Sequence, residues 1–149
     1  MSIILDLQNE SSATSVPAAK QVQKWLKATL QAAYPRLEQT IRIVDEAESR
    51  ALNKQFRGKD SATNVLAFPA DSDLLDYDCL GDLVICAPLV VAEAMAQGKS
   101  EDAHWAHLVV HGMLHLQGYD HQTGDQATRM EALEVEILDT LGYTNPYND

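Results

Sequence analysis

Residues 101–121 read EDAHWAHLVVHGMLHLQGYDH, and this stretch decides the fold. It contains all five histidines of the chain, His104, His107, His111, His115 and His121. At 100° per residue, the first four lie within an arc of about 80° on one helix. The other positions between Trp105 and Leu116 are almost all apolar, which predicts a buried helix. Because an unpaired buried polar group costs about 1–3 kcal/mol, such a histidine stripe is expected to line a cavity.

The last three histidines have the spacing of a metal site. His111 and His115 lie at i and i+4, so both imidazoles can reach one ion. Gly118 then ends the helix and allows His121 to return as a third ligand. Three neutral nitrogens with an open fourth position are typical of catalytic zinc, whereas structural zinc usually has four protein ligands. We therefore expect one zinc ion per chain.

The residues alone leave the ligand set open, because His107 and His111 are also an i, i+4 pair. The set His111, His115 and His121 is favoured because the turn at Gly118 lies beside His115. His104 and His107 are then expected to support the ligands or to line the cavity.

The same spacing occurs in metzincin proteases, H-E-x-x-H-x-x-G-x-x-H, where the glutamate is the general base. Gly112 stands at that position here, so the protease mechanism lacks its proton acceptor. Asp120 could replace it, although a residue that flanks a ligand more often orients that ligand. A metalloprotease-like hydrolase is therefore an alternative function.

The segments around the histidines predict an α+β fold, with residues 1–149 as a single domain. Apolar runs predict four strands, near residues 3–7, 41–43, 63–68 and 83–86, the last two buried on both faces. Helical spacing and capping residues predict five helices, over residues 17–30, 45–56, 88–98, 100–117 and 123–141. The acidic stretch at about 70–79 is expected to be a loop.

Composition excludes several classes of protein. The chain of 149 residues is 46% hydrophobic and 22% charged, which is ordinary for a globular domain. No stretch of about 18 apolar residues predicts a membrane span, and MSIILDLQNE does not resemble a secretory signal. Cys79 and Cys86 lack CxxC spacing and are expected to be reduced. We expect a cytoplasmic location and no membrane partner.

The charge distribution favours a local anionic contact. With a net charge of −11, the chain is not expected to bind along an extended stretch of DNA. Residues 50–59 nevertheless form a basic island that contains no acidic residue. Its cations are Arg50, Lys54, Arg57 and Lys59. An arginine can bind two phosphate oxygens at once, and zinc can polarise a phosphoryl oxygen. The island and the metal together favour an anionic substrate such as a phosphodiester.

Two segments carry a resemblance to a known family. Residues 111–121, HGMLHLQGYDH, match every fixed position of the H-G-x-L-H-L-x-G-Y-D-H signature of the YbeY family of bacterial metal-dependent endoribonucleases. Residues 52–60, LNKQFRGKD, and 63–69, TNVLAFP, resemble its second signature. The ending LGYTNPY, 141–147, also fits, whereas Ala62 and Ala67 replace the usual Pro and Ser.

This resemblance implies an α+β fold in which a mixed four-stranded sheet packs with about five helices, one of them a buried, histidine-bearing central helix. It implies zinc on His111, His115 and His121, and Arg57 as the functional arginine. Arg57 and His111 are accordingly the expected catalytic residues. It further implies cleavage of single-stranded RNA, maturation of the 3′ end of small-subunit rRNA and ribosome quality control.

The partners expected from the resemblance are precursor rRNA, the small ribosomal subunit and its assembly factors, with no DNA. A non-catalytic ribosome assembly factor, in which the metal only organises the site, is a second alternative. It predicts RNA binding without turnover. Two nucleophiles are compatible with the sequence: a metal-activated water, or the 2′-hydroxyl of the RNA.

Overall fold

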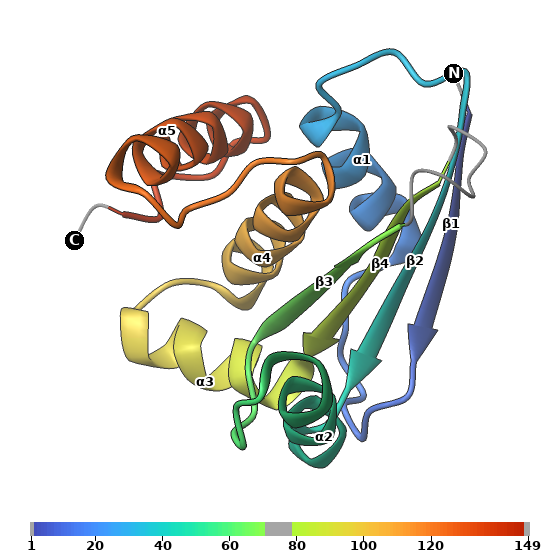
Figure 1. Ribbon diagram of the computed structural model, residues 1–149, viewed down its shortest axis with the longest axis vertical. Helices are drawn as coiled ribbons and strands as arrows, with labels where there is room; N and C mark the ends of the chain where they lie inside the picture. The colour runs from blue at the N-terminus through green and yellow to red at the C-terminus, as the bar shows by residue number, and fades with distance from the viewer. Residues whose placement is uncertain (1, 71–78, 148–149) are drawn as a thin grey trace.

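Four strands form one mixed sheet in the computed structural model, which describes residues 2–70 and 79–147 (Figure 1). The described elements follow the order β1 (Ser2–Asn9), α1 (Ala19–Thr29), β2 (Arg36–Val44), α2 (Glu46–Arg57), β3 (Val65–Pro69), β4 (Cys79–Cys86), α3 (Ala87–Gln97), α4 (Glu101–Leu116) and α5 (Gly124–Thr140). The α+β class, the mixed sheet and the buried histidine-bearing helix are confirmed.

The strand order is β1-β2-β4-β3. The first three strands are parallel, and β3 pairs antiparallel with β4 at the edge of the sheet. Burial on both faces is confirmed for residues 83–86 but was wrong for β3. Leu66 is buried, whereas Val65 and Ala67 are only half-buried, because an edge strand has a neighbour on one side only.

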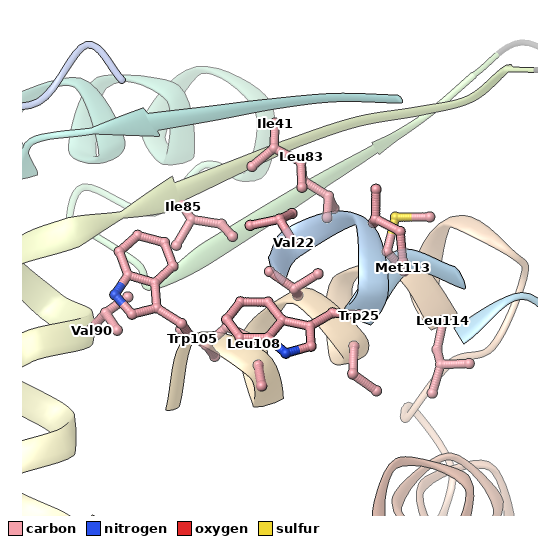
Figure 2. Close-up of a cluster of buried hydrophobic side chains, with 14 of the residues drawn as sticks. Val22, Trp25, Ile41, Leu83, Ile85, Val90, Trp105, Leu108, Met113 and Leu114 are labelled. Atoms are coloured by element: carbon pink, nitrogen blue, oxygen red, sulfur yellow. The ribbon is translucent and has the colours of Figure 1, made fainter. Parts of the chain in front are cut away.

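The main core lies between the sheet and two helices, and Figure 2 shows its large side chains. Trp25 of α1 and Trp105 of α4 pack there with apolar residues of the strands, among them Ile41, Leu83 and Ile85. In Figure 1, α4 lies between the sheet and α5. The histidine-bearing helix is thus covered on opposite sides.

A smaller cluster occupies the opposite face of the sheet. Val44, Leu66 and Val84 are buried there, and Leu52 of α2 packs against them. Val84 lies between Leu83 and Ile85, which face the main core, so the alternation of side chains along β4 separates the two clusters. Helix α2 is therefore fixed on the face that α4 does not cover.

Most of the predicted helix ends are observed. Ser100 caps α4 by accepting a hydrogen bond from the Ala103 N–H, and Thr123 with Gln126 forms the full capping box of α5. Gly58 and Gly98 end α2 and α3. At Asp45 the helix begins as predicted, but its carboxylate accepts hydrogen bonds from Ser12 instead of capping α2.

Two further predictions have partial answers. Helix α1 begins at Ala19 and not at Pro17. Of the predicted acidic loop, residues 71–78 lie outside the described residues.

Cys79 and Cys86 are free thiols, and Cys86 is buried. Across residues 2–70 and 79–147, every helix is too short or too polar to cross a membrane.

Gly81 provides a test of the contact between β4 and β3. Its φ is +133°, and a Cβ added there would lie 2.2 Å from the carbonyl oxygen of Phe68. We expect Gly81→Ala to lower the free energy of unfolding by more than the about 1–3 kcal/mol that backbone strain at a positive φ typically costs, because the new Cβ also overlaps the Phe68 carbonyl oxygen. Urea titration measures this change. Gly98→Ala is the control, because its φ is +67° and its Cβ would meet nothing within 4 Å. Equal losses for the two variants would contradict the steric explanation.

Candidate metal centre and active site

Three histidine rings meet where α4 ends. The ring centre of His111 lies 5.8 Å from that of His115 and 5.4 Å from that of His121. The rings of His115 and His121 are 5.2 Å apart. Gly118 has a φ of +99°, which an L residue rarely adopts, and this turn returns the chain to the helix. The structure thus brings together the three histidines that the sequence favours as ligands.

Two of these histidines have one nitrogen already engaged. His115 Nδ1 lies 2.7 Å from the carbonyl oxygen of Tyr119, and His111 Nδ1 lies 2.9 Å from Oε1 of Glu134. A carbonyl or carboxylate only accepts hydrogen bonds, so both histidines carry their proton on Nδ1. Their Nε2 lone pairs are therefore available to a metal ion.

The arrangement fits a zinc ion. Zn–N bonds of about 2.0–2.1 Å at tetrahedral angles place the ring centres of the ligands about 5 Å apart. A tighter group of potential ligand atoms, all within 4.8 Å of one another, consists of His115, Asp120 and His121. His111 is not in that group, so Asp120 competes with it as a third ligand. The Asp120 carboxylate also accepts a hydrogen bond from the backbone N–H of His121.

Arg57 shares a pocket with the three histidines. The pocket has a volume of about 180 Å³, and its lining residues are Arg57, Thr63, Asn64, Val65, Ala67, His111, Gly112, His115 and His121. Arg57 is the last residue of α2, and Gly58 follows it in the left-handed conformation. The end of α2 therefore places Arg57 in the wall of the cavity that His111 and His115 of α4 also line.

Gly112 lines this pocket and packs against the sheet. A Cβ at this position would lie 2.7 Å from Cδ2 of the buried Leu83. A glutamate, the general base of the metzincin spacing, does not fit between α4 and β4 without moving the core. The close approach of helix and strand thus explains why glycine follows His111.

The basic island is less cationic than its sequence indicates. The Arg50 guanidinium hydrogen-bonds to Asp60, with an Nε to Oδ1 distance of 2.6 Å. This ion pair is exposed, and Asp60 offsets the charge of Arg50. Among the described residues, Arg57 has no carboxylate within 4.0 Å. In the part of the chain that the structure describes, no neighbouring carboxylate therefore offsets the charge of Arg57 at the pocket.

Sequence analysis missed Glu134 and Tyr147. Glu134 is fully buried, and its Oε1 also lies 3.1 Å from Nε2 of His107. The Tyr147 hydroxyl donates to Oε2 of Glu134 at 2.8 Å. A signal was present, because Glu134 shares one face of α5 with Met130, Ile137 and Leu138, which are all buried. A carboxylate on an apolar helix face needs buried partners.

The electrostatics of Glu134 follow from these contacts. Burial by itself raises the pKa of a carboxyl group, but hydrogen bonds from His107, His111 and Tyr147 outweigh burial here. They lower the pKa of Glu134 to about 2. Burial and the neighbouring Glu134 in turn raise the pKa of the Tyr147 phenol. Glu134 is therefore an ionised, acceptor-only group.

His104 belongs to a separate network and does not line the pocket. Its Nε2 lies 2.7 Å from Oε1 of Glu93, to which the Asn64 side chain also donates. Burial lowers the pKa of His104. His104 therefore joins α4 to α3, and Asn64 extends this contact to the pocket wall.

Comparison with known proteins finds similarity to a single protein family along nearly the whole chain. The profile of a family described as Endoribonuclease YbeY matches residues 5–142. Proteins of that name from Pseudomonas entomophila and Pseudomonas syringae are each 54% identical over 147 residues, which cover 97% of this chain and 93% and 88% of those proteins. A solution structure of a Thermotoga maritima protein has the same fold, with a TM-score of 0.55, 22% identity, and coverage of 98% and 97% of the two chains.

The ionised Glu134 predicts a specific pH dependence of stability. The pKa of Glu134 is lower in the folded chain than in the unfolded chain. Its ionised carboxylate therefore stabilises the fold at every pH above its unfolded-state pKa, and this contribution is lost as the pH falls towards about 2. In metal-free protein, the difference in unfolding free energy between wild type and Glu134→Gln should shrink by up to about 1.4 kcal/mol per pH unit below pH 4. Urea titrations between pH 6 and 3.5 measure it. The same trend in Glu136→Gln, on the exposed face of α5, would contradict the assignment.

Proposed function

The chain belongs to the YbeY family, and on that basis we propose that it is a zinc-dependent endoribonuclease that cleaves single-stranded RNA. The observation that carries the proposal is the shared pocket of Arg57, His111, His115 and His121. A phosphodiester is anionic, and its transition state gathers more negative charge. A metal ion and an arginine that share one cavity supply the positive charge that stabilises such a transition state.

Each residue has a distinct role in this proposal. His111, His115 and His121 hold the zinc ion, with His111 presented through Nε2 because Nδ1 is bound to Glu134. When bound, zinc supplies a Lewis acid that polarises a phosphate oxygen and acidifies water. Arg57 binds the oxygens of the scissile phosphate through its planar fork. His111 and Arg57 are thus the proposed catalytic residues.

The surface charge supports a substrate that is held locally. The net charge of −11 repels an extended polyanion, so the pocket and its few neighbouring cations provide most of the attraction. A flexible single strand can place one phosphate in a small cavity, whereas a rigid duplex brings many phosphates close to a chain of net negative charge. This favours single-stranded RNA over DNA duplexes.

We propose the wider role from the family resemblance of residues 52–69 and 111–121. In this role the enzyme works in the cytoplasm on precursor rRNA, matures the 3′ end of small-subunit rRNA and takes part in ribosome quality control. Its partners are the small ribosomal subunit and assembly factors.

Zinc analysis after dialysis tests the ligand set. We expect wild type to retain one zinc ion per chain, and His111→Ala or His115→Ala to lose most of it, because two nitrogens hold zinc too weakly. Asp120→Asn should retain zinc, since Asp120 orients the His121 loop in this proposal. His104→Gln is the matched control on the same helix. If Asp120→Asn loses zinc and His111→Ala keeps it, the ligand set is His115, Asp120 and His121.

Single-turnover cleavage of a short RNA at saturating enzyme tests Arg57. We expect Arg57→Ala to lower the rate by about 10²–10³, as for the loss of one transition-state donor. Arg57→Lys should rescue poorly, because an ammonium lacks the planar fork. Zinc content should not change, and Lys54→Ala, on the exposed side of the same helix, should cleave normally.

A near-wild-type rate for Arg57→Ala would remove it from the catalytic residues. Wild type that binds RNA without cleaving it would favour the non-catalytic assembly factor. Casein hydrolysis that a chelator blocks would favour the protease alternative.

A further inference from the structure

Glu134 lies behind the metal pocket and is not among the residues that line it. It is 0% exposed, and three donors from two segments surround it: His107 and His111 on α4, and Tyr147 beyond α5. A buried charge of this kind is costly unless it is fully hydrogen-bonded. Its contact with the candidate ligand His111 therefore points to a role at the site.

The contacts of Glu134 determine how His111 is protonated. Oε1 lies 2.9 Å from His111 Nδ1, and an ionised carboxylate accepts but does not donate. The proton of neutral His111 is therefore on Nδ1, and the lone pair is on Nε2. The opposite tautomer places a lone pair against the carboxylate and a proton towards the metal, so it loses the hydrogen bond and does not bind the ion.

The carboxylate is itself held on both oxygens. Oε1 also accepts from His107 Nε2 at 3.1 Å, and Oε2 accepts from the Tyr147 hydroxyl at 2.8 Å. The rings of His107 and Tyr147 meet edge to face, with centres 5.4 Å apart. These two donors restrain the carboxylate so that it approaches His111 from one direction only.

The corresponding restraint on His115 comes from the backbone. His115 Nδ1 lies 2.7 Å from the carbonyl oxygen of Tyr119, within the turn that follows α4. Both histidines of the i, i+4 pair thus have an acceptor on Nδ1, and only the acceptor of His111 is a side chain. Substitution of Glu134 therefore changes one of the two restraints and leaves the other in place.

We propose that Glu134 is a positioning residue that raises the zinc affinity of the chain through His111, with His107 and Tyr147 holding its carboxylate in place. This inference rests on the proposed function, because it requires His111 to be a ligand. The carboxylate fixes the direction and the tautomer of the imidazole and increases its basicity. Loss of such an outer partner typically weakens metal binding by 10–100-fold.

A double-mutant cycle on zinc affinity tests the proposal. The dissociation constant for Zn²⁺ is measured by competition with a chromophoric chelator for wild type, Glu134→Gln, His111→Ala and the double variant. We expect Glu134→Gln to weaken binding by about 10–100-fold, and to have no further effect in the His111→Ala background. Glu136→Gln removes the same charge from the exposed face of α5 and should bind zinc like wild type.

The cycle separates positioning from a purely structural role. A general loosening of the fold weakens zinc binding equally in both backgrounds, so an additive cycle would overturn the proposal. Long-range ¹⁵N–¹H spectra of metal-free protein provide a second readout. His111 should be in the Nδ1–H form in wild type, and in both forms in Glu134→Gln, because an amide can accept or donate. A single unchanged tautomer together with unchanged zinc affinity would overturn the proposal.

Tyr147→Phe keeps the test valid if Glu134→Gln does not fold. It removes only the donor to Oε2, so zinc affinity should fall less than in Glu134→Gln, and again only when His111 is present. Unchanged affinity in Tyr147→Phe would contradict the restraint on the carboxylate. Wild type that binds no zinc would instead refute the proposed function. If wild type binds zinc and Glu134→Gln binds it equally well, the proposed function stands and this inference fails.

Discussion

The burial of α4 is the constraint on which the rest of the structure depends. The helix lies between the sheet and α5, so its polar side chains must find partners inside the protein. Glu93 meets His104, and Glu134 meets both His107 and His111. The apolar face of the same helix completes the main core. One element therefore supplies the centre of the fold and two of the three histidines of the candidate site.

The pocket depends on both faces of the sheet. α4 approaches β4 closely at Gly112, and this approach sets how deeply the neighbouring His111 lies in the pocket. α2 is fixed on the opposite face through Leu52, and its last residue is Arg57. The edge strand β3 lies between these helices and contributes Val65 and Ala67 to the wall. The cation and the histidines thus come from opposite sides of the sheet and meet around its edge.

Local patterns made much of this predictable. The helix ends at Ser100 and Thr123 and the turn at Gly58 follow from hydrogen bonds within a few residues, and the structure contains them. The histidine stripe and the return at Gly118 are equally local, which is why the sequence predicts the three rings together.

Long-range contacts were not predictable in the same way. Glu134 reads as one acid in an acidic helix until the packing of α5 on α4 shows its partners. The charge of Arg50 is offset by Asp60, ten residues along, and Asp45 binds Ser12 instead of its own helix. The exposure of β3 follows from its place in the strand order, which no pattern within β3 contains.

The order of the residues along the chain has a consequence for biosynthesis. His111 precedes Glu134 and Tyr147, so a growing chain exposes this imidazole before the carboxylate that orients it exists. At about 5–20 residues per second, the interval between His111 and Glu134 lasts about 1–5 s. During that time α4 also lacks the cover of α5. In the proposed arrangement, the zinc site therefore reaches its full affinity only after α5 has docked, late in the folding of this protein.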